Sequence, residues 1–200
     1  RSVLLFVQEL VSAAPAFLRQ CIAALVHSFL PVEGDEPENG EALGGRDEVS
    51  ALVHVALESI LCACPVATDY VFESLKTTFP HKRREALAHA VYVRHCIAIL
   101  RYSPALMKRV VGLLVARMVE LDVEISLQQR HLEDAAEEEE DDDEPIFEVD
   151  LGDNMSDELA KMRKNANKLD GMMALMFEFI AERCGRLKNS GRSAGIATPG

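Results

Sequence analysis

The strongest constraint on the fold is the spacing of apolar residues, which recur three and four positions apart along nearly the whole chain. That spacing is typical of amphipathic α-helices, and no segment shows the period of two that a half-buried β-strand requires. Hydrophobic residues make up 48% of the 200 residues, which is enough for a packed core and excludes wholesale disorder. We therefore expect an all-α protein.

Proline and capping residues divide this pattern into helices joined by short turns. Asp47 and Ser103-Pro104 are typical of helix starts, whereas Pro65 and Pro80 are typical of helix ends. The expected helices span residues 2–13, 15–29, 47–64, 68–78, 82–102, 104–132 and 156–188, with a flexible loop at 31–46. Such helices predict stacked antiparallel hairpins, a HEAT- or armadillo-like α-solenoid, over residues 1–132. A compact bundle is the alternative, since the hairpins are too dissimilar to prove a repeat.

Acidic residues crowd into one segment of the chain. Between Glu133 and Glu158 there are 15 acids and no Lys or Arg, while the rest of the chain holds 18 acids and 21 bases. Because like charges this dense repel one another, we predict a disordered acidic insert at 133–155. Beyond it, Ser156 is predicted to cap a long helix at 156–188 that completes the array, followed by a flexible tail at 189–200. The apolar stripe expected to pack on neighbouring helices is Leu159, Met162, Ala166, Leu169, Met173, Met176, Ile180, Cys184 and Leu187.

The sequence lacks the motifs of the common catalytic and metal sites. It contains no phosphate-binding glycine loop, no nucleophile elbow and no zinc-protease pair of histidines. Cys62 and Cys64 are two positions apart, so they would point to nearly opposite sides of a helix and make a poor ligand pair. No apolar run approaches the roughly 20 residues of a membrane span. We expect neither an enzyme, nor a cofactor or metal, nor a membrane protein.

A basic surface is the clearest candidate for function. Nine bases and a single acid, Glu85, lie between Lys76 and Arg117. Arginine is enriched among the residues that anchor protein interfaces. A solvated helix face is the simplest alternative. The candidate partner-binding residues are Lys82, Arg83, Arg84, Arg94 and Arg101.

An acidic protein surface is the expected partner of these bases, with the acidic insert screening or modulating them. Direct DNA binding is not expected, because aromatic residues for base stacking are sparse nearby and the insert would compete with phosphate. Ser103-Pro104 and Thr198-Pro199 also match the minimal pattern for proline-directed phosphorylation, although Ser103 equally suits a helix cap.

The order of several short motifs resembles a known family. The motifs are Phe79-Pro80-His81-Lys82-Arg83, Tyr92-Val93-Arg94, Leu100-Arg101-Tyr102-Ser103-Pro104, Leu121-Asp122-Val123-Glu124-Ile125 and, after the acidic insert, Lys168-Leu169-Asp170-Gly171-Met172-Met173. In this order, with helices of similar length between them, they resemble RNA polymerase I-specific transcription initiation factors of the TIF-IA type over about residues 65–181.

The resemblance implies HEAT-type hairpins without catalytic activity or a small-molecule substrate. Such factors bind RNA polymerase I near its stalk and bridge it to promoter-bound core factor at ribosomal RNA genes, in the nucleus and nucleolus, and phosphorylation regulates the polymerase contact. The family continues beyond the closing helix, so this chain is expected to be a piece of a longer protein and to lack much of the core-factor contact. Self-association is left open. A generic helical-repeat scaffold and a helical or metal-dependent enzyme are the alternatives.

Overall fold

The computed structural model describes residues 9, 15–31, 43–138 and 151–185, and all regular structure in those ranges is helical. The elements are η1 (Pro15–Phe17), α2 (Leu18–His27), α3 (Leu43–Ala63), α4 (Ala67–Thr77), α5 (Ala86–Tyr102), η2 (Pro104–Leu106), α6 (Met107–Glu138) and α7 (Leu151–Arg183). The predicted all-α fold is confirmed. Apart from residue 9, the helix expected at 2–13 lies outside the described residues, as does the tail at 189–200.

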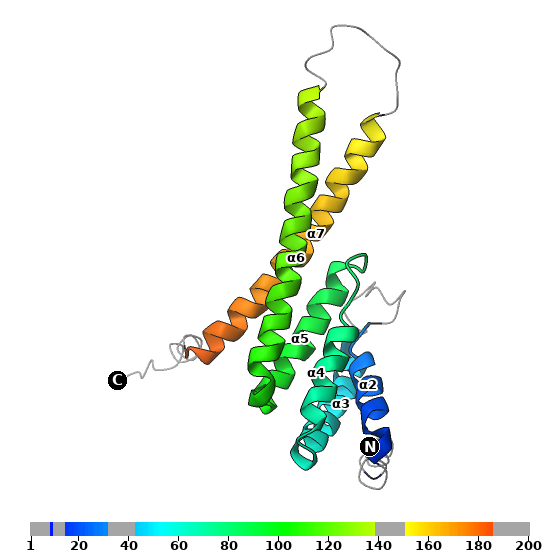
Figure 1. The fold of residues 1–200 in the computed structure, drawn as a ribbon, viewed down its shortest axis with the longest axis vertical. Helices are drawn as coiled ribbons and strands as arrows, with labels where there is room; N and C mark the ends of the chain where they lie inside the picture. The colour runs from blue at the N-terminus through cyan, green and yellow to red at the C-terminus, as the bar shows by residue number, and fades with distance from the viewer. Residues whose placement is uncertain (1–8, 10–14, 32–42, 139–150, 186–200) are drawn as a thin grey trace, which may run out of the picture.

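The helices form two connected parts. Helices α2 to α5 lie side by side as a body against the first half of α6, and the second half of α6 continues away from this body alongside α7 as a long antiparallel arm (Figure 1). Helix α7 then passes α5, so that α5 and α7 share an extensive contact, while α4 packs against α2. The result is a solenoid-like stack of helices, as predicted.

One continuous core joins these helices. Every described α-helix contributes to the largest side chains of this core, namely Ile22, Leu57, Leu75, Tyr92, Ile99, Leu100, Leu114 and Met172, and Phe29 joins them from just after α2. The Tyr92 hydroxyl donates a hydrogen bond of 2.9 Å to the backbone oxygen of Leu75. Since the last carbonyls of a helix have no partner within it, this bond satisfies the end of α4 and fixes α5 against it.

Two histidines connect α3 to α5. The His54 Nε2 and His95 Nδ1 atoms are 3.0 Å apart, and the His54 Nδ1 lies 3.0 Å from the Tyr102 hydroxyl. Phe29, just after α2, stacks on the His95 ring with 4.4 Å between the ring centres. Burial lowers the pKa of His54, because the protonated imidazole loses hydration there.

Two helix starts and one helix cap differ from the predictions. Helix α3 begins at Leu43, so Asp47 lies inside the helix rather than capping it, and the loop expected at 31–46 is shorter at its end. Helix α5 begins at Ala86 instead of Lys82, because Glu85 is extended with φ −63° and ψ 159°. Ser103 occupies the cap position of η2, but its side chain makes no capping hydrogen bond.

The prediction of a disordered segment over 133–155 is wrong at both ends. Helix α6 continues to Glu138 and α7 begins at Leu151, so Ser156 is inside α7 and not its cap. Helices elongate readily once nucleated, and α6 and α7 pack against each other along the arm. Residues 139–150 lie outside the described part of the chain.

The buried face of α7 is rotated from the predicted apolar stripe. Leu159 and Ile180 are 47% and 48% exposed, and Cys184 is exposed as well. The buried side chains are Met176, which the predicted stripe included, and Asn165, Lys168, Met172 and Phe179, which it did not. The buried face was missed because its first two members are polar. On α6, an exposed apolar row consists of Val115, Val119, Val123 and Leu127.

Candidate partner-binding surface

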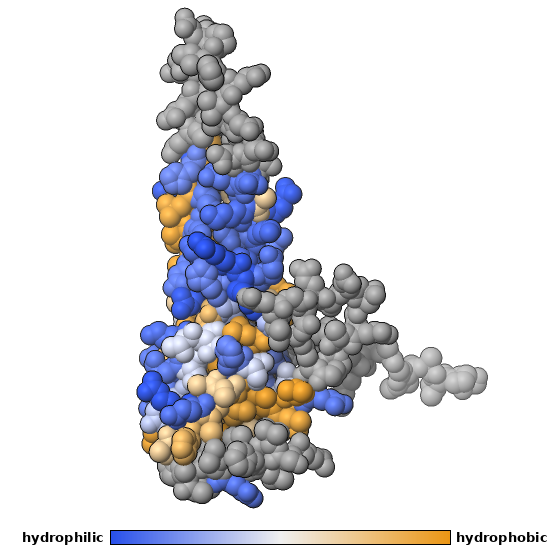
Figure 2. Space-filling view, turned by 90° about the vertical axis from the view of Figure 1, so that its right-hand side faces the viewer, coloured by the Kyte–Doolittle hydropathy of each residue, from blue (hydrophilic) through white to orange (hydrophobic). Residues whose placement is uncertain are grey.

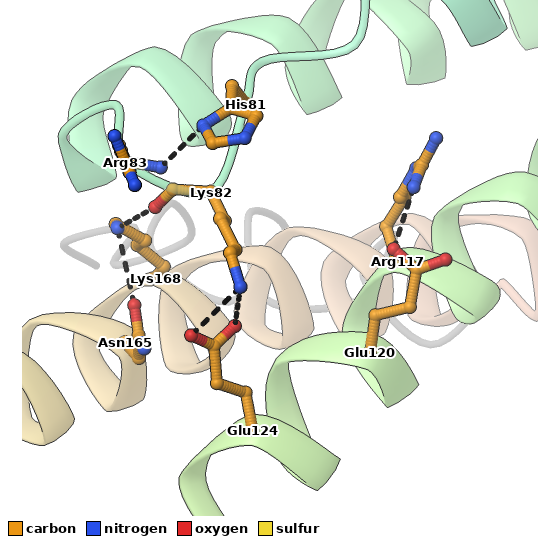
Figure 3. A network of polar contacts seen from close by, with 8 residues as sticks. All are labelled: His81, Lys82, Arg83, Arg117, Glu120, Glu124, Asn165 and Lys168. Carbon is orange, nitrogen blue, oxygen red and sulfur yellow. Dashed lines mark hydrogen bonds and ion pairs between the residues drawn. The ribbon is translucent and has the colours of Figure 1, made fainter.

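The central feature of the surface is the basic turn, which we define as His81–Arg84, between α4 and α5. The Arg84 N–H donates to the His81 backbone oxygen at 2.8 Å and closes the turn. The Arg83 N–H donates to the Nδ1 atom of His81 at 3.3 Å (Figure 3). Pro80, which has no N–H group, is buried just before the turn, so the helical hydrogen-bond pattern of α4 does not continue into it.

The three bases of this turn have different environments. The Lys82 Nζ lies 3.2 Å from both carboxylate oxygens of Glu124 on α6, yet 57% of its side chain is exposed. The half-buried Arg84 donates from Nη2 to the backbone oxygen of Pro31 at 2.8 Å and so connects the turn to the end of α2. Arg83 is exposed, and its guanidinium forms no hydrogen bond or ion pair with the described residues. Arg83 is therefore the base most available to a partner.

Helix α7 supports the basic turn from below. The Lys168 Nζ donates to the Lys82 backbone oxygen at 2.5 Å and to the Asn165 Oδ1 at 3.3 Å (Figure 3). Lys168 is 5% exposed and Asn165 is 4% exposed. Burial lowers the pKa of Lys168, while the negative charges of Glu85 and Glu124 act in the opposite direction.

The other two predicted bases lie away from the turn. Arg94 and Arg101 line a shallow groove of about 270 Å³ between α5 and α7, together with Leu175 and Phe179. The Arg101 Nη2 forms an ion pair of 2.8 Å with the Glu182 Oε2. The structure thus brings Lys82, Arg83 and Arg84 together and places Arg94 and Arg101 in a separate groove.

The positive charge expected from the sequence is partly neutralised by residues outside the basic stretch. Lys82 and Arg101 pair with Glu124 and Glu182, as described above. Arg109 pairs with Asp69 on α4 at 2.5 Å and covers the Phe72 ring, and Arg117 pairs with Glu120 at 2.7 Å. Exposed pairs of this kind contribute little to stability, but they reduce the charge offered to a partner.

A hollow of about 430 Å³ adjoins the basic turn. Its lining includes Phe79, His81, Lys82, Arg117, Glu120 and Glu124. Figure 3 shows Arg117 and Glu120 of α6 across from the turn. The lining holds both acids and bases, which suits a protein segment of mixed charge better than a single anion. His89 also lines the hollow; its ring lies against the Glu85 carbonyl, and burial lowers its pKa.

The helical part of the acidic segment begins well beyond the basic turn along the chain. Glu133 is nine residues beyond Glu124 on α6, or about 13 Å along the helix at 1.5 Å per residue. The helical acids beyond Glu133 are further along the arm. On the face that Figure 2 shows, much of the arm is hydrophilic, with some hydrophobic side chains at its edge, and more hydrophobic side chains gather on the body.

Sequence reasoning missed the residues that support the turn, namely Glu124, Asn165 and Lys168. Asn165 and Lys168 continue the line of Met172, Met176 and Phe179 at spacings of three and four. A polar pair on such a line is the signal that could have identified them as buried. Ser103, by contrast, is 7% exposed, which keeps a kinase from its hydroxyl in the folded chain. Thr198 lies outside the described residues.

Within the described residues, no helix is both long and apolar enough to cross a membrane. The same residues contain no group of three or more His, Cys, Asp or Glu side chains placed to hold a metal ion.

The stacked helices place the chain among helical proteins of solenoid-like architecture, with the basic turn exposed on the surface. Residues 1–196 match the family described as RNA polymerase I specific transcription initiation factor RRN3. The chain belongs to this family, as its motifs suggested.

Individual relatives agree with this assignment. The chain is 25% identical over 211 residues to the mouse RNA polymerase I-specific transcription initiation factor RRN3, covering 94% of this chain and 32% of the mouse protein. It is 28% identical over 75 residues to the factor rrn3 of Schizosaccharomyces pombe, covering 38% of this chain and 12% of that protein. A crystal structure of RNA polymerase I transcription initiation factor Rrn3 matches the fold with a TM-score of 0.63 at 18% identity, over 90% of this chain and 29% of that one. The chain spans about a third of the mouse relative.

Proposed function

We propose that this chain acts in transcription initiation by RNA polymerase I, as the polymerase-binding part of an initiation factor. The observation that carries the proposal is the family match over residues 1–196. The proposed role is to bind the polymerase near its stalk and to help bridge it to promoter-bound core factor at ribosomal RNA genes, in the nucleus and nucleolus. The chain covers 32% of its mouse relative. The part of the role that we assign to it is the polymerase contact, because its basic turn is exposed.

The basic turn is the proposed contact with an acidic surface of the polymerase. Arg83 supports this choice because it is exposed and makes no ion pair within the described ranges. An arginine that meets a carboxylate can make two parallel hydrogen bonds, which give both affinity and orientation. Lys82 beside it is already paired with Glu124, and the half-buried Arg84 donates to the Pro31 carbonyl. Arg83 is thus the proposed anchor.

A pulldown from nuclear extract tests the function. The tagged chain is incubated with extract, and the recovered material is probed for subunits specific to RNA polymerase I and to RNA polymerase II. We expect preferential recovery of polymerase I. Equal recovery of both polymerases, or recovery of neither, would contradict the proposal, and equal recovery would favour a generic helical scaffold.

Two charge-reversal variants localise the contact. Arg83→Glu is expected to reduce polymerase I recovery about tenfold, the loss typical of one interface anchor. Arg19→Glu makes the same change in charge at an exposed position of α2 and serves as the matched control. Equal effects of the two variants would mean that net charge, and not the basic turn, governs binding.

A further inference from the structure

Lys168 is a buried lysine in a helix face that is otherwise largely apolar. It is 5% exposed and lies on the same line of α7 as Met172, Met176 and Phe179, which are all buried. Its ammonium group is satisfied by the Lys82 carbonyl on the basic turn, 86 residues away in sequence, and by the Asn165 side chain one turn away on α7.

Stability alone gives a poor reason for a lysine at this position. Removing an ammonium group from water is costly, and well-packed apolar residues of similar volume often serve the fold as well or better. A methionine would continue the line that Met172 and Met176 already form. What a methionine could not supply is the hydrogen bond to the Lys82 carbonyl.

That hydrogen bond fixes the basic turn from one side while α6 fixes it from the other. The Lys82 carbonyl is bound by Lys168 of α7, and the Lys82 side chain is bound by Glu124 of α6 at 3.2 Å. The side chain of Arg83, the next residue, forms no hydrogen bond or ion pair with the described residues. The direction in which Arg83 leaves the surface therefore depends on how its neighbour Lys82 is held.

We infer that Lys168, together with Asn165, is a positioning residue that holds the basic turn in the conformation that presents Arg83 to a partner. Helix α7 thereby controls the binding geometry of a turn that belongs to α4 and α5. The consequence for polymerase binding rests on the proposed function, whereas the positioning itself does not.

Hydrogen exchange tests the positioning without any partner. In Lys168→Met, the Arg84 amide, which closes the turn, is expected to exchange at least about tenfold faster, because a hydrogen bond from a charged donor has been removed nearby. The amides of α5 beyond its first turn should keep their protection. Lys161→Met removes the same charge from an exposed position of α7 and should leave the turn unchanged.

A second variant keeps the test decisive if Lys168→Met does not fold. Asn165→Ala retains the lysine but removes one of its acceptors, so it should accelerate exchange in the turn by a smaller factor. Normal exchange of the turn in either folded variant would overturn the inference.

Polymerase binding then separates this inference from the proposed function. If the inference and the proposed function both hold, Lys168→Met weakens polymerase binding severalfold in the otherwise wild-type chain. In an Arg83→Ala chain the same substitution should weaken binding little further, because its effect on binding depends on Arg83. Full additivity of the two variants would overturn the positioning role. If exchange of the turn accelerates but neither Lys168→Met nor Arg83→Glu alters binding, the positioning stands and the basic turn is refuted as the polymerase contact.

Discussion

Replacing Arg84 by alanine tests whether Arg84 stabilises the fold while its neighbour Arg83 serves binding. The half-buried Arg84 Nη2 donates to the Pro31 carbonyl at 2.8 Å and so attaches the basic turn to the end of α2. A hydrogen bond from a charged donor contributes roughly 1.5–3 kcal/mol. Because Arg84 is only half-buried, we expect Arg84→Ala to lower the free energy of unfolding by about 2 kcal/mol. For a chain of this size, the melting temperature should fall by roughly 4–8 °C.

Urea unfolding followed by circular dichroism measures this loss, with Arg83→Ala as the neighbouring control. The control should change the unfolding free energy by less than about 0.5 kcal/mol, since Arg83 is exposed. The slope of the unfolding curve should be the same in both variants, because the surface exposed on unfolding is unchanged. Equal stability of the two variants, or greater loss in Arg83→Ala, would refute the assignment of separate roles.

Three other predictions concern stability. Burial lowers the pKa values of His54 and His89 in the folded chain below the 6.5 of the unfolded chain, so the unfolded chain binds more protons on acidification. The contribution of these histidines to stability should therefore be complete above about pH 6.5 and decrease below it. In urea titrations, the free energy of unfolding should fall by at most about 1.4 kcal/mol per pH unit for each histidine. Tyr92→Phe removes the donor to the Leu75 carbonyl and should cost about 1.5 kcal/mol in the same assay. Deletion of residues 139–144 removes mutually repelling acids and should change the melting temperature by less than about 2 °C.

Each of these predictions has a contradicting result. Stability that rises on acidification below about pH 6.5 would contradict the direction assigned to the two histidines. A Tyr92→Phe variant as stable as the wild type would mean that another donor reaches the Leu75 carbonyl. A loss of more than about 2 kcal/mol on deletion of 139–144 would show that this acidic stretch stabilises the fold.

The spacing of apolar residues predicted the helical fold because that spacing can be recognised within each short stretch of the sequence. The ends at Pro65 and Pro80 were predicted within a few residues, since proline acts on its immediate neighbours. The start of α5 was misplaced because it depends on a tertiary arrangement, in which Arg84 closes a turn and reaches Pro31. No local pattern carries that information.

The candidate surface was predictable only in part for the same reason. A run of bases identified Lys82, Arg83 and Arg84, but the acids that neutralise the run lie elsewhere in the chain, as Glu124 shows for Lys82. Lys168 stood out in the sequence only as the first residue of a family motif, although the fold buries it beneath the turn. Charge counting along a sequence cannot distinguish such a paired or buried base from a free one.

Site-specific crosslinking tests the central claim most directly. A photoreactive amino acid is placed at position 83 in the basic turn and, as the control, at position 19 on α2, and each protein is irradiated with purified RNA polymerase I. The account predicts a crosslink to a polymerase subunit from position 83 and none from position 19. A crosslink from position 19 alone, or from neither position while the complex is intact, would contradict it.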